Sequence, residues 1–430
     1  MYKISLLLVL SLSVLPTRWM GQASAADADS TTPTFESTDW PCWRGPDHNG
    51  IASSDQDPPT EWSETENVVW RTAIPGRGHG SAMVFGDAVY VPTADAERTV
   101  QSVICLDRET GKQRWEAIVH QGKAENKSTR QANERASFAS STIATDGQRL
   151  FVNFLYGDAV FTSALDLQGN VLWQQRLCDY ILHQGYGSSP TVYRQLVIAA
   201  ADNKGGGAIV AMNRDSGEVV WRRDRPAKPN YASPVVFTID GQDQLIVTGC
   251  DLVTSLDPAT GQTRWEIEGA TTECVTTSVT DGTHVFSSGG YPDNHISAVV
   301  ADGSGKVAWR TKTRDYVPSM LQRDGVLYAT LDAGIATCIE CETGETLWKA
   351  RLGGTFSASP VMVGDLIYAT NEQGETFVFK ANRESFEQVA HSKLGESVFA
   401  TPTICGGRIY TRVAHYENDK RQEYLYCIGQ

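Results

Sequence analysis

The 430-residue sequence lacks the short motifs that mark several common enzyme classes. It contains no H-E-x-x-H, no G-x-S-x-G and no G-x-x-x-x-G-K-[ST]. These patterns carry the metal ligands, the nucleophile or the phosphate-binding loop of zinc proteases, serine hydrolases and P-loop enzymes. The sequence therefore offers no residue set for those three chemistries, and no catalytic residue is predicted.

Positive charge is also scarce. The chain has 37 Lys and Arg against 51 Asp and Glu, which gives a formal net charge of -14. Duplex-binding proteins draw their affinity from Lys and Arg that neutralise phosphates. We therefore exclude nucleic acid as a partner.

A long apolar run occurs only near the N-terminus and is too short to span a bilayer with ease. Lys3 precedes the run Ile4 to Leu15, and Ala23-Ser24-Ala25 fits the A-x-A cleavage pattern of a signal peptide. We expect residues 1–25 to be removed and the product to be exported to the periplasm or secreted. No Cys stands near the cleavage site, so neither a lipid anchor nor a transmembrane segment is expected.

Cysteine gives little sign of a metal site. The chain has nine Cys, an odd number that cannot all pair within one molecule. Cys338 and Cys341 form a C-x-x-C, but no second Cys pair or His cluster accompanies them. No metal site is predicted.

One pattern recurs six times, each time as strand, tight turn and strand. Asp, Thr or Ser and Gly supply the turn conformations, and a Trp stands in the second strand. Because six Trp in phase cannot all serve one small site, we interpret them as packing between neighbouring units. The segments are CLDRETGKQRW (105–115), ALDLQGNVLW (164–173), AMNRDSGEVVW (211–221), SLDPATGQTRW (255–265), VVADGSGKVAW (299–309) and CIECETGETLW (338–348).

Each unit opens with a patch of small residues followed by another hairpin. Two hairpins make four strands, which is the blade of a propeller. The predicted fold is an all-β, eight-bladed β-propeller of four-stranded antiparallel blades in residues 66–430. The eight openings are residues 78–91, 137–152, 185–199, 230–247, 274–288, 315–330, 355–370 and 397–411.

The two ends of the repeat predict how the ring closes. The seventh unit has Val389 where Trp is expected, and the eighth reaches only a third strand at residues 423–429. A strand around Trp70 has no partner before it and supplies the missing fourth. Eight units from Trp70 onward average about 45 residues, the usual blade period. We therefore expect the strand near Trp70 to lie beside the one near Tyr426, which leaves no free sheet edge.

The signature [AS]-[LM]-[DN]-x-x-[TS]-G-x-x-x-W resembles the tryptophan-docking repeat of the pyrroloquinoline-quinone-like (PQQ-like) propellers. That family includes eight-bladed quinoprotein alcohol dehydrogenases and the propeller lipoprotein of the outer-membrane protein assembly machine. The segment DWPCWRGPDHNGIASS (39–54) also looks like a leader of exported, uncharacterised bacterial members. We interpret residues 26–65, with Trp43, Arg44, Gly45 and Pro46, as a strap packed on the ring.

The sequence departs from both branches of that family. The dehydrogenases resemble one another in a pair of adjacent cysteines beside the quinone, and this chain has no Cys-Cys dipeptide. Its blades are also compact, without the insertions that build a cofactor chamber, so no calcium ligand or Asp base is carried over. Against the assembly lipoprotein, the lipid-bearing Cys is missing.

A binding site is predicted at one end of the central channel. In a propeller, the segments between blades and the loops joining strands two and three emerge on the same face. Arg, His and Tyr there suit anionic or hydroxyl-bearing ligands. The candidate binding residues are Arg77, His79, Arg135, His183, Tyr186, Asn230, Tyr231, Glu273, Asn294, His295, Arg314, Asp315, Tyr316 and His415.

The sequence leaves two functions open. The first is an exported, non-catalytic propeller that binds an envelope protein, a glycan or a small ligand and requires no cofactor. The alternative is a PQQ- and calcium-dependent dehydrogenase that oxidises an alcohol or a sugar, and its support is the family resemblance alone. A long polar loop at residues 120–136 lies on the mouth side, and we expect it to be mobile.

Overall fold

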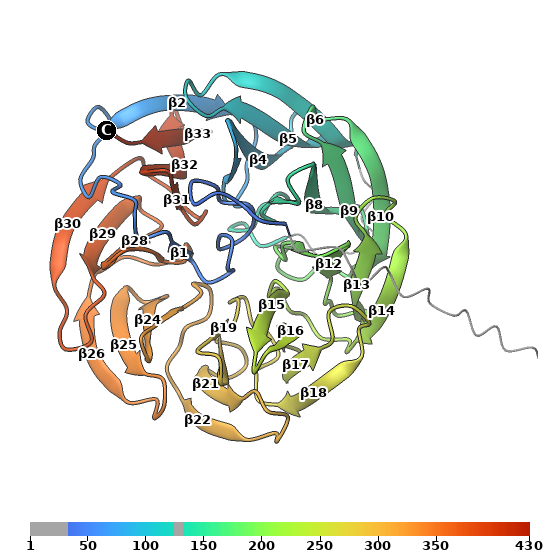
Figure 1. The fold of residues 1–430 in the computed structure, drawn as a ribbon. Helices are drawn as coiled ribbons and strands as arrows, with labels where there is room; N and C mark the ends of the chain where they lie inside the picture. The colour runs from blue at the N-terminus through green and yellow to red at the C-terminus, as the bar shows by residue number, and fades with distance from the viewer. Residues whose placement is uncertain (1–32, 124–131) are drawn as a thin grey trace, which may run out of the picture. The chain divides into compact units, whose positions relative to one another are not determined.

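The computed structural model describes residues 33–123 and 132–430, all within one compact unit, Thr31–Gln430. These residues form 33 β-strands and no α-helix. The strands make eight sheets arranged as blades around a ring (Figure 1). The predicted all-β, eight-bladed propeller is confirmed. The predicted signal peptide lies outside the described residues, as does the middle of the 120–136 loop, residues 124–131.

Blades 1 to 4 follow one another along the chain, and each begins with its inner strand. Blade 1 contains β3 (Met83–Phe85), β4 (Ala88–Asp95), β5 (Val100–Asp107) and β6 (Gln113–Gln121). Blade 2 contains β7 (Ala144–Thr145), β8 (Arg149–Tyr156), β9 (Ala159–Asp166) and β10 (Val171–Asp179). Blade 3 contains β11 (Thr191–Tyr193), β12 (Leu196–Ala200), β13 (Gly207–Asn213) and β14 (Val219–Arg225). Blade 4 contains β15 (Val235–Ile239), β16 (Gln242–Gly249), β17 (Leu252–Leu256) and β18 (Thr263–Glu268).

Blades 5 to 8 complete the ring, and the last two also take strands from the N-terminal part of the chain. Blade 5 contains β19 (Val279–Thr280), β20 (His284–Gly289), β21 (His295–Val300) and β22 (Val307–Thr311). Blade 6 contains β23 (Leu321–Arg323), β24 (Val326–Leu331), β25 (Ile335–Glu340) and β26 (Thr346–Arg351). Blade 7 contains β1 (Ile51–Ala52), β27 (Val361–Val363), β28 (Leu366–Thr370), β29 (Glu375–Lys380) and β30 (Gln388–Lys393). Blade 8 contains β31 (Thr403–Cys405), β32 (Arg408–Glu417), β33 (Lys420–Ile428) and β2 (Val68–Ile74).

The ring closes in blade 8 as the sequence predicts. Strand β2 pairs with β33, with Trp70 opposite Cys427 and Arg71 opposite Tyr426. The outer strand of this blade therefore comes from one end of the propeller and its other three strands from the other end. Blade 7 differs from the prediction because it has a fifth strand, the short β1, which runs parallel to the inner strand β27.

The repeated Trp residues join neighbouring blades. Most of them donate the indole N–H to a backbone carbonyl in the turn of the next blade, as Trp70 does to Arg108 at 2.9 Å. The ring also packs on the turn glycine: a Cβ at Gly111, whose φ is +67°, would lie 2.5 Å from the Trp70 ring. Equivalent bonds to the next blade are made by Trp115, Trp173, Trp221, Trp309 and Trp348, whereas Trp265 donates to Gln244 in its own blade.

The small residues that open each unit form a belt of hydrogen bonds around the channel. A backbone N–H of one blade donates to a Ser or Thr hydroxyl of the next, at 2.9 to 3.0 Å. Among the described residues the belt has two breaks, between Ser233 and Thr277 and between Thr401 and Ser81. The six bonds run from Ser81 to Thr142, Thr142 to Ser189, Ser189 to Ser233, Thr277 to Ser319, Ser319 to Ser359 and Ser359 to Thr401.

Blade 7 lacks the docking Trp, and the position that replaces it differs from the predicted one. Ala390, not Val389, lies opposite Val378 in the register that Trp holds elsewhere. The turn before it spans residues 380–387, whereas the corresponding turn in blade 1 spans only 107–112. This turn is two residues longer and places Ala390 in the Trp register, whereas Val389 is 43% exposed.

Trp62 of the strap packs in the hydrophobic cluster that contains Ala390. Its side chain is 6% exposed and belongs to the same hydrophobic cluster as Ala390, Tyr368 and Val378. Its backbone N–H donates to the Ser392 hydroxyl of the outer strand at 3.0 Å. A Trp from outside the repeat therefore seals the interface between blades 7 and 8.

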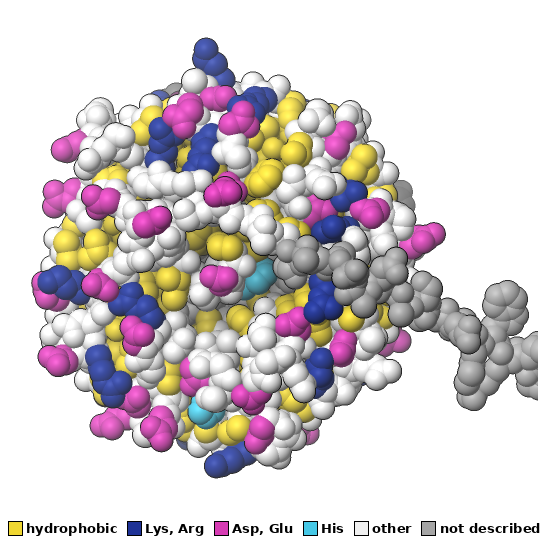
Figure 2. Space-filling view, viewed as in Figure 1, with side chains coloured by type: hydrophobic (Ala, Val, Ile, Leu, Met, Phe, Trp, Pro, Cys, Tyr) yellow, Lys and Arg dark blue, Asp and Glu magenta, His cyan; other side chains and the backbone are white. Residues whose placement is uncertain are grey.

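The strap, of which residues 33–65 are described, crosses the centre of the ring (Figure 1). Trp40 pairs with Val84 in blade 1, and the Pro41 carbonyl accepts from Thr145 of blade 2. The buried Arg44 donates to carbonyl oxygens of blade 6. The strap thus ties together blades that lie on different sides of the channel. Figure 2 shows acidic and basic side chains interspersed around the edge of this view, with apolar side chains in the central hollow.

All nine cysteines are buried and unpaired. Cys338 lies on β25, the third strand of blade 6, opposite Trp348, where it packs in a hydrophobic cluster. Burial raises the pKa of its thiol to about 12 and that of Cys341 to about 12. The C-x-x-C thiols are therefore protonated at neutral pH and serve packing.

Candidate functional site

One end of the channel holds a cavity of about 400 Å³, which we call the mouth cavity. Every blade contributes to its wall through the segment that precedes its inner strand. Blades 6 and 7 add their β24–β25 and β28–β29 loops, and the strap adds Trp43. The lining residues are Trp43, His79, Asn133, Arg135, Ala136, Ser140, Gln184, Gly185, Tyr186, Gly187, Ser189, Tyr231, Ser233, Val275, Arg314, Tyr316, Val317, Asp332, Thr355, Phe356, Ser357, Ser359, Glu372, Phe399 and Thr401.

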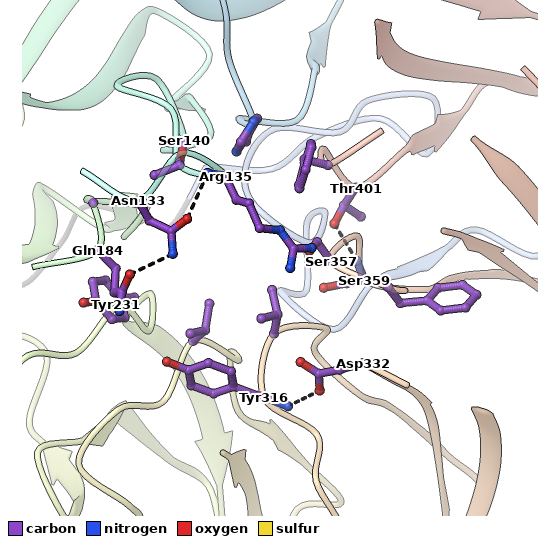
Figure 3. A pocket seen from close by; sticks show the side chains of 18 of the residues that line it. Asn133, Arg135, Ser140, Gln184, Tyr231, Tyr316, Asp332, Ser357, Ser359 and Thr401 are labelled. Carbon is purple, nitrogen blue, oxygen red and sulfur yellow. Dashed lines mark hydrogen bonds between the residues drawn. The ribbon is translucent and has the colours of Figure 1, made fainter. Parts of the chain in front are cut away.

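The structure brings six of the fourteen predicted residues to this cavity. They come from five different inter-blade segments, and several point inward in Figure 3. The six are His79, Arg135, Tyr186, Tyr231, Arg314 and Tyr316.

Three more predicted residues contact the lining from behind. The Arg77 guanidinium lies 5.9 Å from the centre of the Phe399 ring. His183 lies 3.1 Å from the Tyr231 hydroxyl, and Glu273 accepts a hydrogen bond of 2.8 Å from the Tyr316 hydroxyl. These contacts fix the orientation of the two tyrosine rings.

The remaining five predicted residues lie outside the lining. Asn230 is buried and bonded to Asp202 and to the Thr248 carbonyl, so it serves the blade 3–blade 4 interface. His295 is wholly buried beside Ser287, and His415 lies 2.9 Å from the Tyr426 hydroxyl within blade 8. The other two are Asn294, which is exposed on its loop, and Asp315, which is buried.

The acidic residues of the cavity were not predicted from the sequence. Asp332 and Glu372 occupy the same position in two successive blades, in YATLDAG and YATNEQG, so the repeat itself carried a signal for them. Asn133, Gln184 and Phe399 stand in inter-blade segments, as the predicted residues do. Trp43 was expected to pack on the ring, and it also lines the cavity.

Arg135 and Glu372 form an ion pair across the mouth. The pair joins blades 2 and 7, which are not neighbours, and Glu372 also accepts a hydrogen bond of 2.5 Å from the Ser357 hydroxyl. The Arg135 guanidinium lies 5.8 Å from the Phe399 ring centre. His79 stacks on the same ring at 4.6 Å. Phe399 is therefore held between cationic and neutral aromatic neighbours.

The Asp332 carboxylate faces Arg135 from the other side of the cavity (Figure 3). Asp332 accepts the backbone N–H of Tyr316 at 2.7 Å. Burial raises the pKa of the Asp332 carboxyl, although the Tyr316 N–H, Arg314 and Arg135 oppose that rise. Arg314 lies over the Tyr316 ring at 5.1 Å and donates to the Gly290 carbonyl at 3.2 Å.

The floor of the cavity is the strap. Trp43 donates its indole N–H to the Thr277 hydroxyl at 2.8 Å, at one of the two breaks in the hydroxyl belt. The next residue, Arg44, is 1% exposed and donates to the carbonyls of Asn49, Ser319 and Met320. The strap thus enters the wall of the mouth cavity through Trp43, and we call this concave surface the cup.

Four histidines should make the folded protein less stable in acid. Burial lowers the pKa of His120 and of His295 to about 4, and it also lowers the pKa of His79 and His48. Between pH 6.5 and 4 the unfolded chain then binds more protons than the folded one, so stability falls as the pH drops. For His120 and His295 the loss approaches on the order of 3 kcal/mol each. Burial raises the pKa of Asp315, so protonation of this carboxyl favours the folded state as the pH drops and opposes the effect of the histidines.

Urea unfolding at pH 7 and pH 5 measures this effect. His120 stacks on Tyr156 at 4.5 Å, so H120F keeps the ring contact and removes the titrating group. We expect H120F to show a smaller difference between the two pH values than the unaltered protein. An equal difference would contradict the assignment of His120 to this loss.

The fold and site define a closed eight-bladed propeller with a cup at one end of its channel. The chain belongs to the family whose model is described as outer membrane protein assembly factor BamB, which matches residues 49–135, 99–350 and 292–411. One relative is the outer membrane protein assembly factor BamB of Burkholderia pseudomallei (strain K96243), which is 25% identical over 372 residues. That match covers 82% of this chain and 87% of the relative.

Solved structures share the fold across both branches of the resemblance. BamB from Moraxella catarrhalis matches with a TM-score of 0.58 and 13% identity, over 83% of this chain and 96% of that one. A europium-containing methanol dehydrogenase matches with a TM-score of 0.63 and 11% identity, over 92% of this chain and 98% of that one. The quinohemoprotein alcohol dehydrogenase of Comamonas testosteroni matches with a TM-score of 0.65 and 12% identity, over 91% of this chain and 81% of that one. At these identities the likeness shows the fold alone.

The mouth cavity does not fit a calcium-bound quinone. Among residues 33–123 and 132–430, no three His, Cys, Asp or Glu side chains stand where they could share a metal ion. The two acidic residues of the lining are already engaged, Glu372 by Arg135 and Asp332 by the Tyr316 amide. The sequence also lacks adjacent cysteines.

Among residues 33–123 and 132–430, no helix is long and apolar enough to cross a membrane.

Proposed function

We propose that this protein is an exported, non-catalytic propeller of the cell envelope that works as a binding scaffold. Its binding surface is the mouth cavity with the surrounding rim. Membership of the BamB family supports an envelope role with a protein partner, because the curated relative is named as an assembly factor. Export rests on the N-terminal signal sequence.

The observation that carries this proposal is the cup itself. All eight blades and the strap contribute to one concave surface with charged, aromatic and amide side chains. Binding residues are commonly placed on loops that a rigid scaffold holds, and the closed ring is such a scaffold. The dehydrogenase alternative has less support, since the described residues hold no group of three His, Cys, Asp or Glu side chains that could share a metal ion.

Site-specific cross-linking in the native envelope tests the proposal. A photoreactive amino acid replaces Gln184 in the mouth cavity, and the matched control replaces Lys380, which is exposed at the turn before β30. We expect the Gln184 position to capture a defined envelope component that the Lys380 position does not. Equal capture at both positions would contradict a binding role for the mouth.

Enzyme assays provide the second arm. Purified protein, supplied with quinone and calcium, is offered alcohols and sugars. We expect no turnover under these conditions. Sustained oxidation of any of these substrates would overturn the non-catalytic assignment.

A further inference from the structure

We propose that the mouth cavity binds a neutral saccharide, whose hydroxyl groups bridge the charged residues of the wall and whose ring faces lie against its aromatic side chains. This inference rests on the proposed function, because it names the ligand class of the same cavity. The ligand is defined by its chemistry, and both a free oligosaccharide and a chain end of an envelope glycan present it.

The first observation is the balance of charge in the wall. Two cations, Arg135 and Arg314, and two carboxylates, Asp332 and Glu372, line the same cavity. An anionic ligand would have to displace Glu372 from Arg135, and a cationic one would meet both arginines. A hydroxyl group donates and accepts at once, so it can bond to a carboxylate and a guanidinium without separating the pair.

The second observation is the set of fixed aromatic faces. Tyr231 and Tyr316 line the wall, and their hydroxyls are held by His183 and Glu273. Burial raises the pKa of both tyrosines, so their hydroxyls stay protonated. Trp43 closes the floor with its indole N–H bonded to Thr277. Rings that are already held in place lose little freedom when a flat apolar face packs on them.

The third observation is a pair of amides that face each other. The Asn133 side chain donates to Gln184 at 2.8 Å, and Asn133 accepts from the backbone N–H of Arg135 at 2.9 Å (Figure 3). These bonds orient the Gln184 amide and use its oxygen, which leaves its two N–H donors. Amide donors, carboxylate acceptors and aromatic faces together match the alternating polar edge and apolar face of a sugar ring.

The size of the cup agrees with a small ligand. Its volume of about 400 Å³ falls in the usual range for small-molecule sites. A bound molecule enters the cup from the mouth. The ion pair of Arg135 and Glu372 spans part of that entrance.

Calorimetric titration of the purified protein tests this proposal. The probes are maltose, cellobiose and N,N′-diacetylchitobiose as neutral disaccharides, with glucuronate as the anionic comparison. We expect at least one neutral disaccharide to bind with a Kd below about 1 mM. The variants D332N and E372Q keep the size of each side chain, and each should weaken that binding at least about tenfold, because a hydrogen bond to a charged group is lost.

The matched control is E340Q. Glu340 pairs with Arg383, and its side chain is 17% exposed against 11% for Glu372, but the pair lies outside the mouth cavity. We expect E340Q to bind as the unaltered protein does, and thermal unfolding of all variants shows whether each is folded. The proposal is overturned if no neutral disaccharide binds at 10 mM probe (about tenfold above the upper limit expected), if only glucuronate binds, or if E340Q weakens binding as much as E372Q.

Two further measurements separate the possible sources and the two proposals. Co-sedimentation with purified cell-wall sacculi, with maltose as competitor, distinguishes a polymeric glycan from a free oligosaccharide. Failure of every sugar, combined with mouth-specific capture of a protein from the Gln184 position, would remove the saccharide and leave the scaffold function standing. Loss of both signals would remove the scaffold function as well.

Discussion

Replacing Trp70 with alanine is expected to lower the free energy of unfolding by about 3–5 kcal/mol, as for other buried tryptophans. Trp70 is 7% exposed, and its indole packs on the turn glycine Gly111 and the ring of Tyr410. It also donates to the Arg108 carbonyl of blade 1. The substitution therefore removes one of the contacts that join blade 8 to blade 1.

Urea unfolding of W70A, followed by circular dichroism, measures this loss. The matched control is V69A, on the same strand, because Val69 is 39% exposed and its truncation should cost no more than about 0.5 kcal/mol. A value for W70A within about 1 kcal/mol of the unaltered protein would mean that the shared blade contributes little to stability.

The second large effect concerns Trp62 and the blade that lacks its own tryptophan. W62A should also cost about 3–5 kcal/mol, although Trp62 lies outside the repeat, because it opens a cavity between blades 7 and 8. A390W in the unaltered protein should cost about 1–3 kcal/mol, since Ala390 is buried in a cluster that already contains Trp62. The free energy of unfolding of the double variant W62A/A390W should exceed the value expected from adding the two single losses by about 1–3 kcal/mol.

The control for this cycle is V389W. Val389 is 43% exposed, so a tryptophan there points away from the interface and should not compensate for W62A. Additive losses in the A390W cycle, or rescue by V389W instead, would show that the register or the role of Trp62 is misassigned. The measurement is again the free energy of unfolding for the four members of each cycle.

The blade number and the closure could be predicted because they rest on local patterns. Each unit is two short hairpins with a Trp at a fixed distance from a turn glycine, so segments such as 105–115 and 255–265 repeat whatever the rest of the chain does. The missing fourth strand then had one remaining source, the strand of Trp70. Both inferences need counting within the sequence and no knowledge of side-chain packing.

Other features depend on contacts between distant residues. Ala390 takes the Trp position because a longer turn shifts the register, and Trp62 joins its hydrophobic cluster from 328 positions away in the sequence. The strap contacts the inner ring through the Trp43–Thr277 hydrogen bond, and nothing in the local sequence connects these two residues. Tertiary packing decides such positions, and spacing within one unit does not reveal it.

The candidate site was partly predictable for the same reason. Inter-blade segments converge on the mouth in any propeller, so His79, Arg135 and Tyr231 could be placed there. Whether a residue of a loop faces the channel or the blade interface depends on its exact conformation, and Asn230 turns toward Asp202 instead. Prediction of Asp332 and Glu372 would have required aligning the β24–β25 loop of blade 6 with the β28–β29 loop of blade 7.

The leader segment supplies a hydrogen-bond donor to Thr277, which stands at a break in the hydroxyl belt. That donor is the Trp43 indole, a side chain from outside the repeat. The same side chain is part of the cavity wall. A substitution at Trp43 therefore changes the ligand surface and the inner circle of blades together.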